Sequence, residues 1–300
     1  MIYSTSFYAD LYSFFDIWID LDSRIWYILI MNTLINTFEK KTRTAKSDLS
    51  SLHFHNGYEF IFVTNGSVLI EIDNITHNVK SPAIVLLNPF EQHKITGKSN
   101  DYERIILVLN SDILEQNVSP HLIAMIKCRP QDFSHAIKPS ENDFMRICTI
   151  LDSIFEETNN DNVFGERYVL NCIYNLLILM YRAQSNISNI SSNMIKVQTY
   201  IDENYSKIES VSQIAQKFCL SVPHLSRTFK AYSGYSPMEY LKNTRLYHAS
   251  RLLIYSDMHV NEIGAMVGFR DTNNFIKQFK SKFNTSPYKF RINNSKTAIK

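Results

Sequence analysis

Two stretches of the C-terminal third decide the fold, because the second repeats the first. The first is IAQKFCLSVPHLSRTFKAYSGYSPMEY, from Ile214 to Tyr240, and the second is IGAMVGFRDTNNFIKQFKSKFNTSPYKF, from Ile263 to Phe290. Matching residues lie 49 positions apart at the start of the copies and 50 apart after one inserted residue near Gly268. Self-similarity of this kind indicates one structural unit that the chain uses twice.

Each copy has the pattern of a helix-turn-helix. A short helix carries isoleucine and a small residue on its inner face, and a capping box of Ser210 and Gln213 opens it in the first copy. After a tight turn, a second helix begins at a capping residue, Ser221 or Asp271. The inner stripe of this second helix recurs every four residues, at Leu225 and Phe229 in the first copy and at Phe275, Phe279 and Phe283 in the second.

The repetition decides between two interpretations of this pattern. A helical hairpin with a solvated basic face would explain one copy alone. Two copies, each followed by Ser-Pro and separated by a predicted helix over 239–255, favour two helix-turn-helix units instead. We therefore expect the C-terminal domain to be all helical and to bind double-stranded DNA.

The outward face of each second helix carries the candidate DNA-binding residues. Polar side chains there can hydrogen-bond to base edges, and lysines can contact phosphates. The expected set is Pro223, His224, Ser226, Arg227 and Lys230 in the first copy, with Thr272, Asn273, Ile276, Lys277 and Lys280 in the second.

The charge distribution agrees with this expectation. The 300 residues carry a net charge of only +2, but residues 190–300 hold sixteen Lys and Arg against seven Asp and Glu, a net of +9. Residues 1–189 carry a net of −7. A basic module joined to an acidic remainder is typical of a nucleic-acid-binding protein. The seven glycines form no phosphate-binding loop, and the four cysteines form no CxxC pair, so we expect reduced thiols in the cytoplasm.

The stretch from His259 to Arg291 resembles the signature of the arabinose-regulator (AraC/XylS) family of bacterial transcription factors. The resemblance extends over about residues 195–291 and implies seven helices, with two helix-turn-helix subdomains joined by a long helix and inserted into adjacent major grooves. It places Pro223, Ser226, Arg227, Thr272, Asn273 and Lys277 at base-facing positions. Pro223 departs from the pattern because it cannot donate a hydrogen bond, so it would read shape or a thymine methyl group, as Ile276 would. The family also implies a homodimer, contact with RNA polymerase and, most commonly, activation.

The N-terminal part alternates short apolar runs with turn residues. Runs at 58–64, 68–73, 83–87 and 104–109 predict strands of a sandwich or small barrel. Apolar residues at helical spacing predict helices over 141–157 and 166–182, which would pack on the barrel and, by family resemblance, form a dimer interface. The expected fold class is α+β: an N-terminal cupin-like β-barrel or sandwich plus helices, followed by the all-α domain with two helix-turn-helix subdomains.

The segment around HFHNGYEF resembles a cupin-like sensory domain. His53, His55, Glu59 and Gly66 meet the first cupin motif, whereas Pro89 and His93 meet only part of the second. His53, His55, Glu59 and His93 are thus the candidates for a metal site, and parity along a continuous strand would bring the first three to one face. Because the second motif is degraded, we expect no metal or cofactor, but an organic effector, such as a sugar, bound by His53, His55, Tyr58, Glu59, Phe60 and His93.

We expect five segments along the chain. They are an aromatic-rich extension (1–45), a cupin-like sensory domain (46–135), a helical dimerisation region (136–184), a linker (185–193) and the DNA-binding domain (194–300). Residues Ile25 to Phe38 predict a buried amphipathic helix, too short and polar to cross a membrane. The function favoured is an effector-responsive transcription regulator that is not an enzyme. Two alternatives stay open: a metal-binding cupin enzyme with a DNA-binding tail, and an effector-independent regulator whose barrel is a scaffold.

Overall fold

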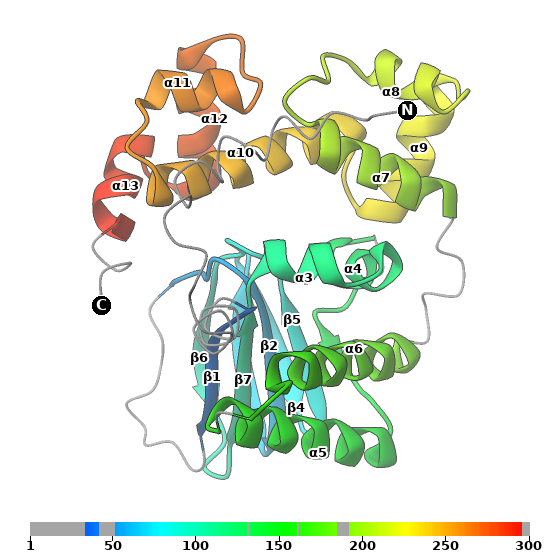
Figure 1. Ribbon diagram of the computed structural model, residues 1–300, viewed down its shortest axis with the longest axis vertical. Coiled ribbons are helices and arrows are strands. Elements are labelled where there is room, and N and C mark those ends of the chain that lie inside the picture. Colours follow the sequence, from blue (N-terminus) through cyan, green and yellow to red (C-terminus); the bar gives the residue numbers. More distant parts are fainter. Residues whose placement is uncertain (1–33, 42–51, 131–132, 161, 185–191, 296–300) are drawn as a thin grey trace.

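The computed structural model describes residues 34–41, 52–130, 133–160, 162–184 and 192–295. Figure 1 shows the helical C-terminal part at the top and, beneath it, two β-sheets with the helical pair α5 (Glu141–Thr158) and α6 (Gly165–Ala183) alongside them. The N-terminal strands and the C-terminal helices contact one another through the short helices α3 (Ser111–Asn117) and α4 (Pro120–Lys127) and the loops beside them.

Two antiparallel sheets form the N-terminal sandwich. The larger sheet has the order β1-β7-β2-β5-β8 and the smaller one β4-β3-β6. The strands of the larger sheet are β1 (Ile35–Lys41), β2 (Tyr58–Asn65), β5 (Ala83–Leu87), β7 (Glu103–Leu109) and β8 (Ala136–Ile137). Those of the smaller sheet are β3 (Ser67–Ile72), β4 (Ile75–Lys80) and β6 (His93–Lys98). The four predicted strands are therefore confirmed as β2, β3, β5 and β7.

Strand β2 is apolar on both faces because both are covered. Phe60 and Phe62 point toward the helices, whereas Ile61 and Val63 point between the sheets. Side chains alternate along a strand, so a strand between two cores must be a continuous apolar run. The same holds for β5, all of whose residues are buried. This alternation decides which residues of β2 can share a site.

The predicted helix at Ile25–Phe38 is wrong at its C-terminal end. Residues from Ile35 onward form β1, which pairs antiparallel with β7 from Leu109 to Arg104; residues 25–33 lie outside the described part. Apolar residues of this segment fit a helical period and a strand about equally well. The open edge of β7 supplies backbone hydrogen bonds that a local pattern cannot reveal, and it fixes the segment as a strand.

The helices α5 (Glu141–Thr158) and α6 (Gly165–Ala183) confirm the two helices predicted before the linker. Their apolar stripes, which include Ile147, Leu151, Ile173 and Leu177, cover the outer face of the larger sheet and complete its second core. Ser140 caps α5 by accepting a hydrogen bond from the backbone N–H of Asp143.

Within residues 192–295 the C-terminal part consists of seven helices, as the family resemblance predicts. They are α7 (Ser192–Asn204), α8 (Val211–Lys217), α9 (Val222–Ser233), α10 (Pro237–Tyr255), α11 (Val260–Met266), α12 (Thr272–Phe283) and α13 (Pro287–Ser295). Figure 1 shows the α8–α9 and α11–α12 units at opposite ends of α10.

The predicted caps of the two repeats are present. The side chains of Ser221 and Asp271 accept hydrogen bonds from the backbone N–H groups of His224 and Asn274. The capping box at Ser210 is only half formed, because the Gln213 side chain accepts from the N–H of Glu209 rather than of Ser210. The small residue of the second copy is required by packing, since a Cβ on Gly264 would lie 2.9 Å from the ring of Phe275.

Candidate DNA-binding surface and ligand cavity

Helices α9 and α12 present the ten predicted DNA-binding residues at the surface. Eight are exposed, and Ser226 and Ile276 are half-buried. The inner faces hold Leu225 and Phe229 in α9 and Phe275 and Phe279 in α12, all fully buried. Each helix is thus fixed by its apolar face while its polar face stays accessible, which is the arrangement that groove reading requires.

Helix α10 sets the separation of the two units. Its 19 residues correspond to about 28 Å at 1.5 Å per residue. One turn of B-form DNA is about 34 Å, the spacing between successive major grooves on one face. A Ser236–Glu239 capping box opens the helix, and Pro237 occupies its first turn. The length of α10 therefore suits two adjacent grooves.

The C-terminal ends of both recognition helices rest on the N-terminal domain. At the end of α9, the carbonyl of Ser233 accepts a hydrogen bond of 3.0 Å from the backbone N–H of Arg129. At the end of α12, the ring of Phe283 lies 5.6 Å from that of Phe90. Arg227, in the middle of α9, and Thr272, at the N-terminal end of α12, do not take part in these contacts.

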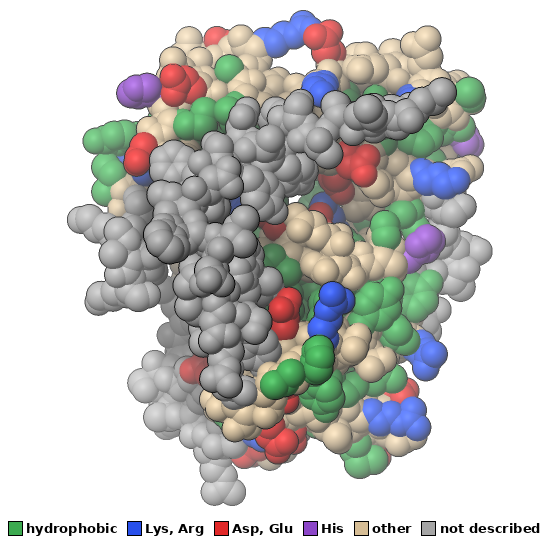
Figure 2. Space-filling model, viewed as in Figure 1, with side chains coloured by type: hydrophobic (Ala, Val, Ile, Leu, Met, Phe, Trp, Pro, Cys, Tyr) green, Lys and Arg blue, Asp and Glu red, His purple; other side chains and the backbone are tan. Residues whose placement is uncertain are grey.

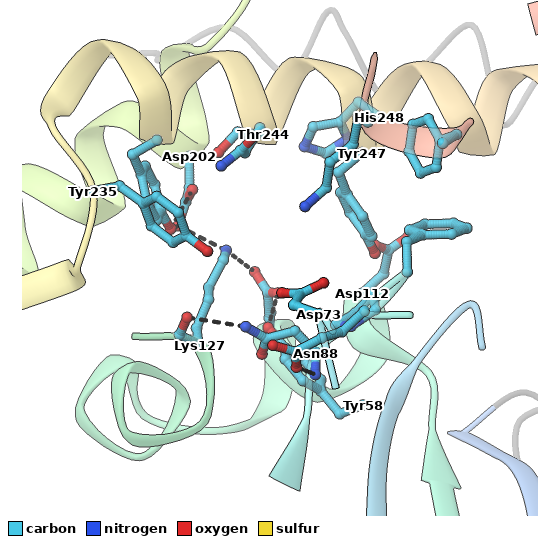
Figure 3. Close-up of a pocket in the computed structure, with 18 residues that line it drawn as sticks. Tyr58, Asp73, Asn88, Asp112, Lys127, Asp202, Tyr235, Thr244, Tyr247 and His248 are labelled. Carbon is cyan, nitrogen blue, oxygen red and sulfur yellow. Dashed lines mark hydrogen bonds and ion pairs between the residues drawn. The ribbon is translucent and has the colours of Figure 1, made fainter. Parts of the chain in front are cut away.

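A cavity of about 200 Å³ opens between the two domains. Figure 3 shows its lining: Tyr58, Asn88 and Lys127 come from the N-terminal domain, and Thr244 and His248 come from α10. The complete lining is Tyr58, Asp73, Asn88, Pro89, Phe90, Glu91, Asp112, Glu115, Lys127, Asp202, Tyr235, Tyr240, Asn243, Thr244, Tyr247, His248, Lys282 and Phe283. Any molecule in this cavity would touch both domains.

Lys127 is the centre of a charged network across the domain interface. Its Nζ lies 2.9 Å from Oδ2 of Asp202 and 3.2 Å from Oε2 of Glu115, which belong to different domains. The hydroxyl groups of Tyr58 and Tyr240 donate to Glu115 and Asp202. Burial alone would lower the pKa of Lys127, but the two carboxylates outweigh it and raise the pKa well above its usual value. The lysine therefore stays charged and joins the domains.

His248 is neutral in this cavity. Burial, with a smaller contribution from Lys127, lowers its pKa to about 4. Its ring stacks on Tyr205, with centroids 4.0 Å apart and planes 5° apart. A neutral imidazole can both donate and accept a hydrogen bond, so it adds a polar group without adding charge.

Four of the six predicted effector-binding residues come together elsewhere, inside the sandwich. Nε2 of His93 and Nε2 of His55 lie 3.0 and 3.4 Å from Oε2 of Glu59. The candidate ligand nitrogens of His53, His55 and His93 all lie within 4.8 Å of one another. The reason predicted for this grouping is wrong, because no continuous strand runs from His53 to Glu59. Instead β2 begins at Tyr58, and His53 forms an isolated bridge with His93.

Tyr58 and Phe60 do not share this site. They lie on the opposite face of β2 from Glu59: Tyr58 reaches the interdomain cavity, and Phe60 is fully buried in the core under α5 and α6. The prediction of one pocket lined by Tyr58, Phe60 and His93 therefore has to be corrected, since strand alternation separates these side chains.

Apart from Tyr58, sequence reasoning did not find the residues of the interdomain cavity. Lys127 and Asp202 are 75 positions apart, and nothing in the local pattern links them. One signal was present: Lys127 ends the otherwise apolar helix PHLIAMIK, where a charged side chain needs a partner. No helix within the described part of the chain is long and apolar enough to cross a membrane.

Comparison with known proteins gives the same two parts. Residues 41–162 match the AraC-like ligand binding domain family, and residues 214–293 match a helix-turn-helix domain family. The lactose operon transcription activator of Staphylococcus xylosus is 30% identical over 159 residues, which cover 51% of this chain and 57% of that protein. The transcriptional activator RhaS of Escherichia coli O139:H28 is 22% identical over 246 residues, or 80% of this chain and 86% of RhaS.

A solved structure with the same fold is ToxT from Vibrio cholerae O395, with a TM-score of 0.51 at 14% identity, covering 87% of this chain and 99% of ToxT. The order of the two matched domains, the seven C-terminal helices and the repeated helix-turn-helix agree with one another. The chain therefore consists of an AraC-like ligand-binding domain followed by an AraC-type helix-turn-helix domain.

Proposed function

We propose that the chain activates transcription from promoters that it recognises with both helix-turn-helix units, under the control of a small effector. The observation that carries the DNA-binding part is the pair of recognition helices with exposed polar faces at the two ends of α10. In this proposal Arg227, Ser226 and Pro223 read one major groove, and Thr272, Asn273 and Lys277 read the next. His224, Lys230, Ile276 and Lys280 complete the contact surface.

The effector site we propose is the interdomain cavity rather than the sandwich interior. The cavity has five carboxylates and two lysines in its lining. Two of the carboxylates, Glu91 and Asp112, are paired with Arg129 and Arg251 behind them. The three remaining carboxylates outnumber the two lysines, so the net negative charge of the lining disfavours an anion. Tyrosine hydroxyls, amides and aromatic faces suit an uncharged polyhydroxylated molecule of about monosaccharide size.

The regulator is proposed to act as a homodimer through α5 and α6. Figure 2 shows hydrophobic side chains among charged ones over this helical pair. Met145, Phe155 and Tyr168 are 63%, 44% and 49% exposed, and Val163 and Phe164 in the connecting loop are more exposed still. Apolar groups gathered on an otherwise polar surface are typical of an interaction site. RNA polymerase is the further partner that activation would require.

The DNA-binding part is tested with a site selected from a random duplex pool. Arg227→Ala is expected to weaken binding to the selected site by roughly 1–3 kcal/mol and to relax its base preference. Lys280→Ala is expected to weaken binding to selected and random duplexes alike and to lower the salt slope by about one. Equal losses on both duplexes for Arg227→Ala would contradict base reading by Arg227, and failure to select any site would reject the function.

The effector part is tested by thermal shift of the full chain against neutral monosaccharides and, as matched controls, the corresponding sugar phosphates. A neutral sugar is expected to raise the unfolding temperature, and Thr244→Trp, which fills the cavity, is expected to abolish that shift. Thr244 is buried on the cavity side of α10, where Figure 3 shows it. Stabilisation by the phosphates alone, or a shift that survives in Thr244→Trp, would overturn the assignment.

A further inference from the structure

Arg270 is the residue that the second copy of the repeat has and the first lacks. Backbone hydrogen bonds of the two turns match at an offset of 49 as far as Phe269, whose N–H donates to the carbonyl of Gly264. From Asp271 onward, where the carbonyl accepts from the N–H of Phe275, they match at an offset of 50. The equivalent bonds of the first copy run from Leu220 to Ala215 and from Leu225 to Ser221. The turn before α12 is therefore longer by one residue, and that residue is Arg270.

This longer turn touches the first copy directly. Figure 1 shows the turn between α11 and α12 facing the loop between α7 and α8 above α10, whereas the sheets lie below α10. A guanidinium nitrogen of Arg270 lies 2.5 Å from Oε1 of Glu209 in that loop. Beside this pair, Gly268 packs so closely that an added Cβ would lie 2.6 Å from the carbonyl oxygen of Ser206. The two copies are thus joined by a second contact in addition to α10.

Arg245 fixes the loop of the first copy to the middle of α10. It lies where α10 passes from the core of the first copy, which includes Leu241, to the core of the second, which includes Leu246. Its guanidinium donates to the carbonyl oxygens of Tyr205 over 2.8 Å and of Ile208 over 2.5 Å. The side chain of Tyr205 packs against both cores. The loop is therefore held by both copies and not by its own copy alone.

The contact between residues 205–209 and residues 268–270, which we call the inter-repeat contact, limits how the two units can move. Units joined by one connection rotate relative to each other unless an interface holds them, and a long helix bends gently along its length. The inter-repeat contact closes a loop beside α10. Two separate connections between the same two bodies remove the rotation that a single helix would allow.

We propose that the inter-repeat contact sets the spacing of the two half-sites that the chain accepts on DNA, with Gly268 and Arg270 as positioning residues. Neither residue has to touch a base, because both act through the angle between α9 and α12. Given the proposed reading of two adjacent grooves, on which this rests, one base pair inserted between the half-sites shifts the second groove by about 3.4 Å and turns it by about 35°. Recognition helices held at a fixed angle cannot follow that change.

The first test compares a selected duplex with the same duplex carrying one extra base pair between its half-sites, using the full chain. The unaltered chain should bind the longer duplex at least about 30-fold more weakly, because a misplaced recognition helix loses its base contacts. In Gly268→Ala this ratio should fall below about 5-fold, since the freed units can each find a groove. An equal loss of affinity on both duplexes in Gly268→Ala would show a role in stability alone and overturn the proposal, as would an unaltered chain that accepts the extra base pair.

The matched control for Gly268 is Cys219, its counterpart in the turn of the first copy. Cys219 has a φ of 54° and Gly268 a φ of 98°, so this position of the turn accepts a side chain in the left-handed conformation. Cys219 is exposed, and Cys219→Ala should keep the full spacing ratio. A ratio that falls equally in Cys219→Ala would attribute the effect to the turn and refute the role of the inter-repeat contact. Far-UV circular dichroism checks that each variant is folded.

The ion pair is tested by exchanging its charges. Arg270→Glu should lower the spacing ratio by about 3-fold, which is the scale of an exposed ion pair, and adding Glu209→Arg should restore it. If Arg270 contacts a phosphate instead, Arg270→Glu and the double variant would both lower the salt slope by about one, and the ratio would not recover. That result would overturn the positioning role of Arg270.

A measurement without DNA separates the inter-repeat contact from the proposed function. Nitroxides introduced as a noncanonical amino acid at Ala231 and Ser281, which are equivalent exposed positions of α9 and α12, report the distance between the units by electron–electron double resonance. The distance distribution should be narrow in the unaltered chain and broader in Gly268→Ala. Equal widths would overturn the proposal even if the chain selects a DNA site. Failure to select any site, together with a broader distribution in Gly268→Ala, would reject the proposed function and support the inter-repeat contact.

Discussion

Gly234 allows the contact between α9 and the N-terminal domain to be tested with an internal control. It ends α9 in the left-handed conformation, with φ of 82°, and the equivalent residue of the second copy, Asn284, ends α12 with φ of 54°. Asparagine is therefore acceptable to the backbone at this position of the repeat. What differs is the surroundings: a Cβ on Gly234 would lie 1.8 Å from the carbonyl oxygen of Arg129.

The expected magnitude follows from that distance. A carbon–oxygen contact needs about 3.3 Å, and the added Cβ would lie only 1.8 Å from the Arg129 oxygen, so Gly234→Asn must move the Arg129 segment away by roughly 1.5 Å. A shift of this size breaks the 3.0 Å hydrogen bond from Arg129 N–H to Ser233, which is worth about 1 kcal/mol. It also loosens the packing of Tyr232 on Ala124 and Cys128. We expect a total loss of about 2 kcal/mol at the interface.

Hydrogen exchange with urea unfolding measures this loss. A cost of about 2 kcal/mol corresponds to roughly 30-fold faster exchange of the Arg129 amide in Gly234→Asn, while α5 and α6 stay protected. Asn284→Gly, the matched change at the other copy, should alter stability by less than about 0.5 kcal/mol. If the Arg129 amide exchanges at the same rate in Gly234→Asn and in the unaltered chain, the two domains are not docked as described. A similar loss in Asn284→Gly would show that the cap alone, and not the interface, sets the effect.

Two further predictions concern the cavity. Lys127→Met should lower the free energy of unfolding in urea by about 1–3 kcal/mol, less than for a fully buried pair, because a fifth of the lysine side chain is exposed. Adding Asp202→Asn should restore part of the lost stability. A loss under about 0.5 kcal/mol in Lys127→Met would contradict the network. For His248, the folded-state pKa of about 4 lies below the unfolded value of 6.5, so the unfolded chain binds more protons below pH 6.5, and stability falls as pH drops toward 4. The free energy of unfolding should fall by about 2 kcal/mol between pH 7 and pH 5. His248→Phe, which keeps an aromatic ring stacked on Tyr205, should remove this pH dependence. An unchanged pH profile in that variant would refute the assignment.

The C-terminal domain was predictable from sequence because its determinants are local. Caps such as Ser221 and Asp271 and stripes such as Phe275 and Phe279 lie within one helix, where spacing alone places them. The offset of 49 and then 50 residues between the copies also pairs the residues of the first with their counterparts in the second, which the sequence alone is enough to show. The strands were partly predictable, and β5 was predicted to the residue, because an apolar run flanked by turns leaves little choice.

The interdomain cavity and the first strand were not predictable from such rules. Strand β1 exists because β7 offers it an unpaired edge, a property of the sheet and not of residues 35–41. Glu115, Lys127 and Asp202 meet only after α4 and α7 are packed together. The motif spacing selected His53 and His55 correctly, but the predicted reason for their grouping, one continuous strand, was wrong. The structure brings them together through a bridge between His53 and His93.

The two copies of the repeat differ most in how they are attached to the N-terminal domain. The first is attached by polar groups: the Cys128 thiol donates to Gln198 of α7, and Lys127 pairs with Asp202 of the same helix. The second is attached by the aromatic cluster that includes Phe54. Polar interfaces depend on geometry and tolerate little displacement, whereas aromatic contacts persist through small shifts. A ligand that moves the domains by an ångström would therefore release the first recognition helix before the second, and the two half-sites on DNA would respond to the effector unequally.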